Sequence, residues 1–107
     1  MNKPTPQSYL RRNLVLELYE AGGKAFLSDM RLAMRKHLWE GKEIADMKER
    51  TTGEDAWWNN VRWEVNRLKK EGYVHRHTER GLWALSEKGI GLAEDYIANP
   101  IPTLDDF

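Results

Sequence analysis

The stretch that decides the fold is Trp57–Ser86, WWNNVRWEVNRLKKEGYVHRHTERGLWALS. Its first half has apolar residues at steps of three and four, namely Trp58, Val61, Val65 and Leu68. This spacing predicts a helix, and Gly72 supplies a residue suited to the left-handed conformation that ends one. The second half predicts a β-hairpin, with strands near Tyr73–His77 and Leu82–Leu85 about a polar turn at 78–81.

A helix that runs directly into a two-stranded hairpin is typical of the recognition helix and wing of a winged helix-turn-helix. The flanking sequence predicts a first helix over 7–20, a short strand at Lys24–Leu27 and a second helix capped by Ser28 or Asp29. A last helix is expected from a Ser86 cap to about Ala98. We therefore expect an α+β winged helix-turn-helix with about four helices and a small three-stranded antiparallel sheet.

The chain length of 107 residues fits one domain with its own core. We expect a flexible N-terminus at 1–6, the winged-helix domain at 7–98, and an acidic tail or linker remnant at 99–107. Without cysteine the chain has no disulfide and no thiolate metal ligand. It also has no signal peptide core and no apolar stretch of about 20 residues. A cytoplasmic location and no membrane contact are therefore expected.

Charge is balanced overall but unevenly distributed along the chain. Seventeen Lys and Arg residues match seventeen Asp and Glu residues, so overall charge gives no support to nucleic-acid binding. Residues 56–80, however, carry six basic and three acidic residues, a local charge of +3. Residues 81–107 carry one lysine and five acids, a local charge of −4. The expected helix and wing are therefore locally basic.

The sequence from 57 to 94 resembles the N-terminal winged-helix domain of Mrr-type restriction proteins. The matching residues are Trp58, Asn59-Asn60, Val61, Trp63, Leu68-Lys69-Lys70, Gly72 and the run RGLWALSEKG at 80–89. The resemblance implies a module that recognises DNA for a separate nuclease domain, and related modules read methylated bases. Two features depart from the family pattern, since Glu64 stands where alanine is usual and the 107 residues contain no counterpart of the nuclease domain.

The polar side of the expected helix carries side chains suited to a DNA groove. Asparagine can bond adenine through two hydrogen bonds, and arginine can bond guanine in the same way. The alternative is an ordinary solvated helix face, but the hairpin that follows favours DNA contact. The candidate DNA-binding residues here are Asn59, Asn60, Arg62, Trp63, Asn66, Arg67 and Lys70.

The expected wing adds four further candidate DNA-binding residues: His75, Arg76, His77 and Arg80. Arg76 and Arg80 could contact phosphates, which position a protein on a duplex without reading its sequence, and a histidine could reach the backbone or the minor groove. The alternative is a polar hairpin tip that serves only solubility, and the concentration of basic side chains favours DNA.

Trp63 is unusual because it lies on the polar side of the helical wheel. It could pack beneath the first helix or the wing, or it could touch a thymine methyl group or stack on a flipped or modified base. We favour packing for Trp63, and a place in the core for Trp57, Trp58 and Trp83.

Neither a metal site nor an enzyme is expected. His75 and His77 are two residues apart, but two imidazoles do not complete a zinc site, which needs three or four protein ligands. The chain has no P-loop, nucleophile elbow or paired-lysine nuclease motif. We therefore expect no catalytic residue and no cofactor.

The expected partner is double-stranded DNA. Because the net charge is zero, binding by a monomer should be weak, so a homodimer or a nuclease domain or subunit would help. Two other functions stay open. A dimeric transcriptional regulator would recognise an inverted repeat, whereas a protein-interaction adaptor would expose Trp57 and Trp63 together as an apolar patch.

Overall fold

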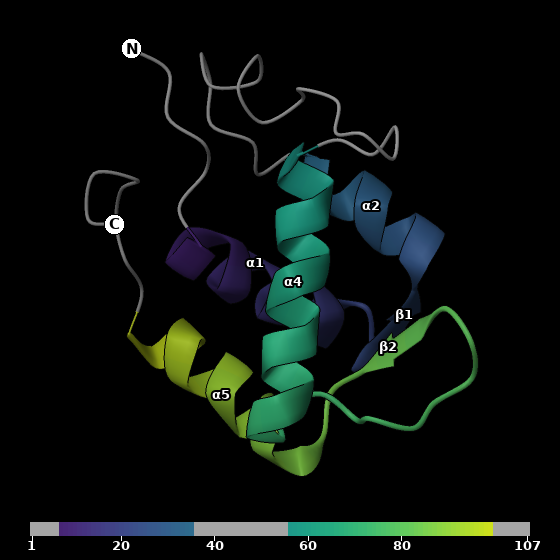
Figure 1. The fold of residues 1–107 in the computed structure, drawn as a ribbon. Helices are drawn as coiled ribbons and strands as arrows, with labels where there is room; N and C mark the ends of the chain where they lie inside the picture. Colours follow the sequence, from purple (N-terminus) through teal and green to yellow (C-terminus); the bar gives the residue numbers. More distant parts are fainter. Residues whose placement is uncertain (1–6, 36–55, 100–107) are drawn as a thin grey trace, which may run out of the picture.

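The fold is described from a computed structural model, over residues 7–35 and 56–99 (Figure 1). These residues form an α+β fold with four helices and a two-stranded antiparallel sheet. The elements are α1 (Gln7–Glu20), β1 (Lys24–Phe26), α2 (Leu27–Arg35), α4 (Ala56–Glu71), β2 (Leu82–Ala84) and α5 (Glu87–Ala98). Helix α1 contacts α2, α4 and α5, and is therefore the central helix of the fold. Over the described ranges, no helix combines the length and apolar character of a membrane span.

The core forms where the apolar stripe of α4 meets α1. Its side chains are Leu10, Leu14, Val15 and Leu18 from α1 and Trp57, Trp58, Val61, Val65 and Leu68 from α4. The ring of Trp58 packs at 5.6 Å from that of Trp57 and stacks at 5.7 Å on that of Trp83. The core positions predicted for these three tryptophans are therefore confirmed, and the stacked pair joins α4 to β2.

The first and last helices agree with the sequence prediction. Helix α1 spans Gln7–Glu20, and Ser86 caps α5 by accepting a hydrogen bond from the Gly89 amide at 3.1 Å. The predicted cap of the second helix is wrong, because α2 begins at Leu27 and both Ser28 and Asp29 lie within it. The Leu27 amide donates to the Gly81 carbonyl at 2.7 Å, so the hairpin turn satisfies the start of this helix.

Other sequence features lie outside the described residues. They are the possible helical turns at 42–48 and the expected loop at 51–53. The proposed flexible N-terminus at 1–6 and most of the proposed tail at 99–107 also lie outside them.

The predicted three-stranded sheet is wrong, since the described residues contain two strands. Strand β1 pairs with β2, as predicted for the segment before the second helix. The expected strand at Tyr73–His77 is reduced to one bridge between Val74 and Leu85, with hydrogen bonds from the His75 amide to the Ala84 carbonyl and from the Ser86 amide to the Tyr73 carbonyl. Beyond that point the Leu82 amide bonds the nearby Glu79 carbonyl at 3.0 Å, so local turn contacts replace cross-strand pairing.

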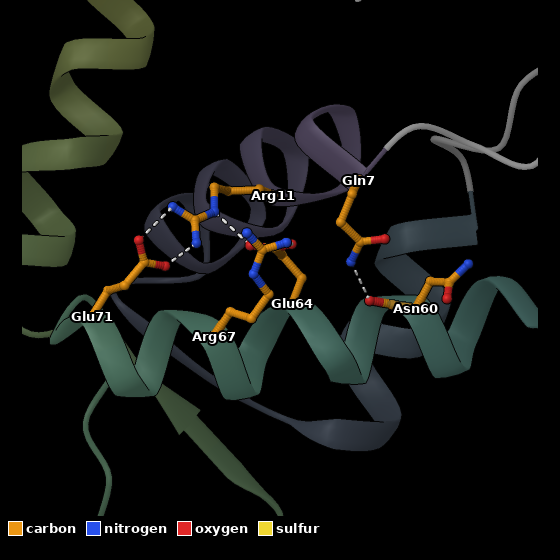
Figure 2. Close-up of polar contacts among 6 residues, drawn as sticks. All are labelled: Gln7, Arg11, Asn60, Glu64, Arg67 and Glu71. Carbon is orange, nitrogen blue, oxygen red and sulfur yellow. Dashed lines mark hydrogen bonds and ion pairs between the residues drawn. The ribbon is translucent and has the colours of Figure 1, made fainter.

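A polar network fixes α4 against α1 (Figure 2). The side chain of Arg11 lies between two carboxylates of α4, donating from Nε to Glu64 at 2.5 Å and from Nη2 to Glu71. Glu64 is only 1% exposed, and Arg67 lies 3.5 Å from its other oxygen. The Gln7 side chain also donates to the Asn60 carbonyl at 2.8 Å. One flank of α4 is thus bonded to α1 along much of its length.

The contacts of this network stabilise the charged forms of Arg11 and Glu71. Burial opposes the charged form of Arg11, but hydrogen bonds to Glu71 and Glu64 outweigh this effect and raise the pKa of the guanidinium above its usual value. The hydrogen bond from Arg11 in turn lowers the pKa of Glu71. The buried carboxylate of Glu64 is therefore accompanied by a cation that stays charged, which burial of a carboxylate requires.

Gly89 marks the closest approach between α5 and the segment after α4. A Cβ atom at this position would lie 2.0 Å from the Tyr73 carbonyl oxygen and 3.0 Å from a methyl carbon of Leu85. The same carbonyl accepts the Ser86 amide at 3.0 Å, so it cannot move freely away. Gly91, one half-turn further along the same helix, would meet nothing within 4 Å.

We expect Gly89→Ala and Gly91→Ala to change stability in opposite directions. Gly89→Ala should lower the free energy of unfolding by roughly 1–3 kcal/mol, as overpacking does in a tight site. Gly91→Ala should raise it by up to about 1 kcal/mol, because alanine favours a helix over glycine. Urea denaturation of both variants provides the comparison, and a stabilising Gly89→Ala would contradict the close approach of this position to the Tyr73 carbonyl.

Replacing one partner of the Arg11–Glu64 pair should lower the free energy of unfolding more than replacing both partners. Arg11→Leu should lower the free energy of unfolding by about 3 kcal/mol, the low end for a buried pair that loses one partner, because Arg67 still reaches Glu64. Replacing both residues by leucine should restore most of that loss. Glu71→Gln is the control and should cost under about 1 kcal/mol, since the Glu71 side chain is 46% exposed. Equal losses in all three variants would contradict this account.

Candidate nucleic-acid interface

Two adjoining hollows lie between α4 and the hairpin loop, defined as residues 75–81. The first has a volume of about 360 Å³ and is lined by Leu27, Arg62, Val65, Asn66, Lys69, Arg80, Gly81 and Trp83. The second has a volume of about 550 Å³ and is lined by Trp63, Asn66, Lys69, Lys70, Arg76 and His77. Because Asn66 and Lys69 line both, the hollows form one surface, named here the α4–loop groove.

The position of α4 determines which side chains reach this groove. Val61, Val65 and Leu68 are buried in the core, and Glu64 is turned toward α1. The remaining strip of the helix carries Arg62, Trp63, Asn66, Lys69 and Lys70, whose spacing of three and four residues places them on one side. The polar strip therefore faces away from α1 because the other sides of the helix are already occupied.

Local contacts hold the hairpin loop opposite α4. Gly81 has φ of 79°, in the left-handed region that favours glycine, and its carbonyl accepts the Leu27 amide. The Thr78 hydroxyl donates to the Leu82 carbonyl at 2.6 Å, which closes the loop on itself. In Figure 1 the loop extends outward between the end of α4 and β2. This arrangement brings Arg76, His77 and Arg80 to the groove.

The groove is basic although the chain is neutral. Five cationic residues line it: Arg62, Lys69, Lys70, Arg76 and Arg80. None of the described residues that line the two hollows is acidic. A hollow at the α1–α2 side has the opposite character, since Glu17, Glu20 and Asp29 are among its lining residues. Charge is thus separated in space, and a groove of one sign attracts the opposite sign more strongly than net charge suggests.

The structure brings seven of the candidate DNA-binding residues together. These are Arg62, Trp63, Asn66, Lys70, Arg76, His77 and Arg80. Asn60 and Arg67 lie instead on the flank of α4 that is bonded to α1 (Figure 2). Asn59 is half-buried and His75 is exposed, and neither lines the groove.

Lys69 is the groove residue that sequence reasoning missed. It lines both hollows, although only its neighbour Lys70 was predicted to bind DNA. A signal was present, because Arg62, Asn66 and Lys69 follow each other at steps of four and three. Reading the helix as one strip would have found it.

Trp63 does not pack as predicted. Its side chain is 58% exposed, so the preference for a packing role is wrong. The buried arc of α4 already contains six residues, and position 63 lies outside that arc. Trp57 is fully buried, so the exposed pair of Trp57 and Trp63 that would favour an adaptor does not form.

The described residues contain no group of three or more His, Cys, Asp or Glu side chains that could hold a metal ion. His75 and His77 are both exposed, and only His77 lines the groove. The chemistry that this surface offers is therefore cationic, amide and aromatic.

Comparison with known proteins gives one result that bears on this surface. The family model described as the Mrr N-terminal domain matches residues 12–95, which include α4, the hairpin loop and β2. No curated protein and no solved structure gives a match to the chain. The match covers most of the sequence and confirms the resemblance seen in it. The chain therefore belongs to the Mrr N-terminal domain family, which suggests a restriction-system context.

Proposed function

We propose that this chain is a winged-helix module that recognises duplex DNA for a restriction or defence system. The observation that carries the proposal is the α4–loop groove, which is lined by five cationic residues and by no acidic residue among those described. In this proposal α4 is the recognition helix and the hairpin loop is the wing. The wing is a loop whose base is the bridge between Val74 and Leu85 rather than a regular hairpin.

The side chains of the groove suit two kinds of DNA contact. Arg76 and Arg80 on the loop, with Lys69 and Lys70 on the helix, are placed to meet phosphates, which supply most of the affinity. Arg62 and Asn66 are suited to base edges in the major groove, as arginine pairs with guanine and asparagine with adenine. The module itself is proposed to be non-catalytic, since its groove offers binding groups only.

Partners follow from the charge distribution. Because the chain is neutral overall, the α4–loop groove predicts weak binding by one copy, so we propose that a nuclease domain or subunit, or a second copy, adds affinity. A dimeric transcriptional regulator would use the same groove and differs in requiring an inverted repeat. The adaptor function loses support because Trp57 is buried.

Charge removal at the loop should weaken DNA binding in a salt-dependent way. Arg76 and Arg80 are exposed, so the double variant Arg76→Gln/Arg80→Gln should fold normally. It should lower affinity for a duplex at least about tenfold at low salt, and reduce the slope of log K against log salt by about 0.9 for each phosphate that the variant no longer neutralises. Fluorescence anisotropy with a labelled duplex measures both quantities.

Arg67→Gln is the matched control, because it removes one charge from the α1 flank of the same helix. Its affinity should stay within about twofold of the parent, with an unchanged salt slope. The proposal fails if the loop variant and the parent bind alike, or if neither binds DNA at low salt. Running the titration with unmethylated, adenine-methylated and cytosine-methylated forms of one duplex decides whether a modified base is read.

A further inference from the structure

Trp63 is an exposed indole on a helix that otherwise buries its aromatic residues. Trp57 and Trp58 on the same helix are 0% and 2% exposed, whereas Trp63 is 58% exposed. An indole has a large apolar face and one polar N–H, so it gains most when another flat group covers it. The packing of the described core does not use this side chain, which leaves its face available to a ligand.

The surroundings of Trp63 indicate the chemistry of that ligand. Trp63 is the one aromatic ring other than His77 among the described residues lining the 550 Å³ hollow, and the other lining groups are the amide of Asn66 and the cations of Lys69, Lys70 and Arg76. This volume lies within the range of small-ligand sites, about 300–1,000 Å³. An apolar protein segment would find one apolar surface here, the indole of Trp63, among cationic and amide groups, whereas a nucleotide combines a flat base with a negative phosphate.

Paired duplex DNA cannot use this hollow fully. In a duplex the faces of the bases are stacked on one another, and the grooves offer only base edges. An unstacked base exposes its face, and stacking on an aromatic side chain is the usual way in which proteins hold such a base. Asn66 lies three residues after Trp63 on the same strip of α4, where its amide can bond the edge of a base that covers the indole.

We propose that Trp63 and the hollow beside it bind an unstacked nucleobase of DNA, with Lys69, Lys70 and Arg76 meeting the flanking phosphates. The inference rests on the proposed function, because it names a DNA feature that the same groove recognises. It predicts that the module prefers a duplex with one unpaired nucleotide over the fully paired duplex of the same sequence.

The test compares the affinities for these two duplexes at one salt concentration. The parent should bind the duplex with the unpaired nucleotide at least about tenfold more tightly, as expected for one base stacked on an aromatic ring. Trp63→Ala should bring the ratio of the two affinities to about one, and Trp63→Phe should keep part of it. Leu32→Ala is the control, since Leu32 is 75% exposed on α2, lines neither hollow and should leave the ratio unchanged.

The outcomes separate the two proposals. Equal affinities of the parent for the two duplexes would overturn the role of Trp63 while leaving DNA recognition in place. If Trp63→Ala still prefers the duplex with the unpaired nucleotide, the role of Trp63 would also be overturned while DNA recognition stays in place. Binding of neither duplex at low salt would overturn the proposed function together with this inference. Circular dichroism melting of each variant confirms that the exposed substitutions leave the fold intact.

Discussion

The arrangement of this fold depends on one buried carboxylate and its arginine. Glu64 lies in the middle of α4, almost without solvent contact, and Arg11 of α1 reaches it from the opposite helix. A buried carboxylate without a cation is costly, so α4 is stable in the orientation that keeps the pair together. Arg11 also bonds Glu71 two turns later, and the two contacts together fix the rotation of α4 about its own axis.

The rotation of α4 about its own axis determines which of its side chains reach the candidate interface. With one flank bonded to α1 and the apolar stripe in the core, α4 can present only its remaining strip to solvent. The hydrogen bond between Leu27 and Gly81 then holds the loop across from that strip, so α4 and the loop that follows it in the sequence make one basic groove. The neutral net charge of the chain conceals this separation, because none of the described residues that line the groove is acidic.

The sequence predicted those parts of the fold that depend on local periodicity. The helices α1, α4 and α5, the Ser86 cap and the buried positions of Trp57, Trp58 and Trp83 were all confirmed. The sequence prediction failed where the structure of a segment depends on the residues that it contacts. The segment Tyr73–His77 has residues typical of a strand. Local turn contacts replace most of its cross-strand pairing, however, so that one bridge remains.

The same difference between local periodicity and packing contacts determines which residues of the candidate site could be predicted. Periodicity separates the polar from the apolar side of α4, and the groove residues Arg62, Trp63, Asn66 and Lys70 were found that way. It does not show which polar flank faces α1, so Asn60 and Arg67 were grouped with residues that point elsewhere. The burial of Glu64 and the exposure of Trp63 both reverse the usual preference of the residue type, and only the packing partners reveal them.

The central claim is that the α4–loop groove is the face that meets DNA. The most direct measurement is a two-dimensional NMR titration of the labelled chain with a short paired duplex. The account predicts shifts in the Trp63 indole, the Asn66 side-chain amide and the loop amides from 76 to 80, with the buried Trp57 indole unchanged. Shifts concentrated on α5 or on the acidic hollow between α1 and α2 would contradict it.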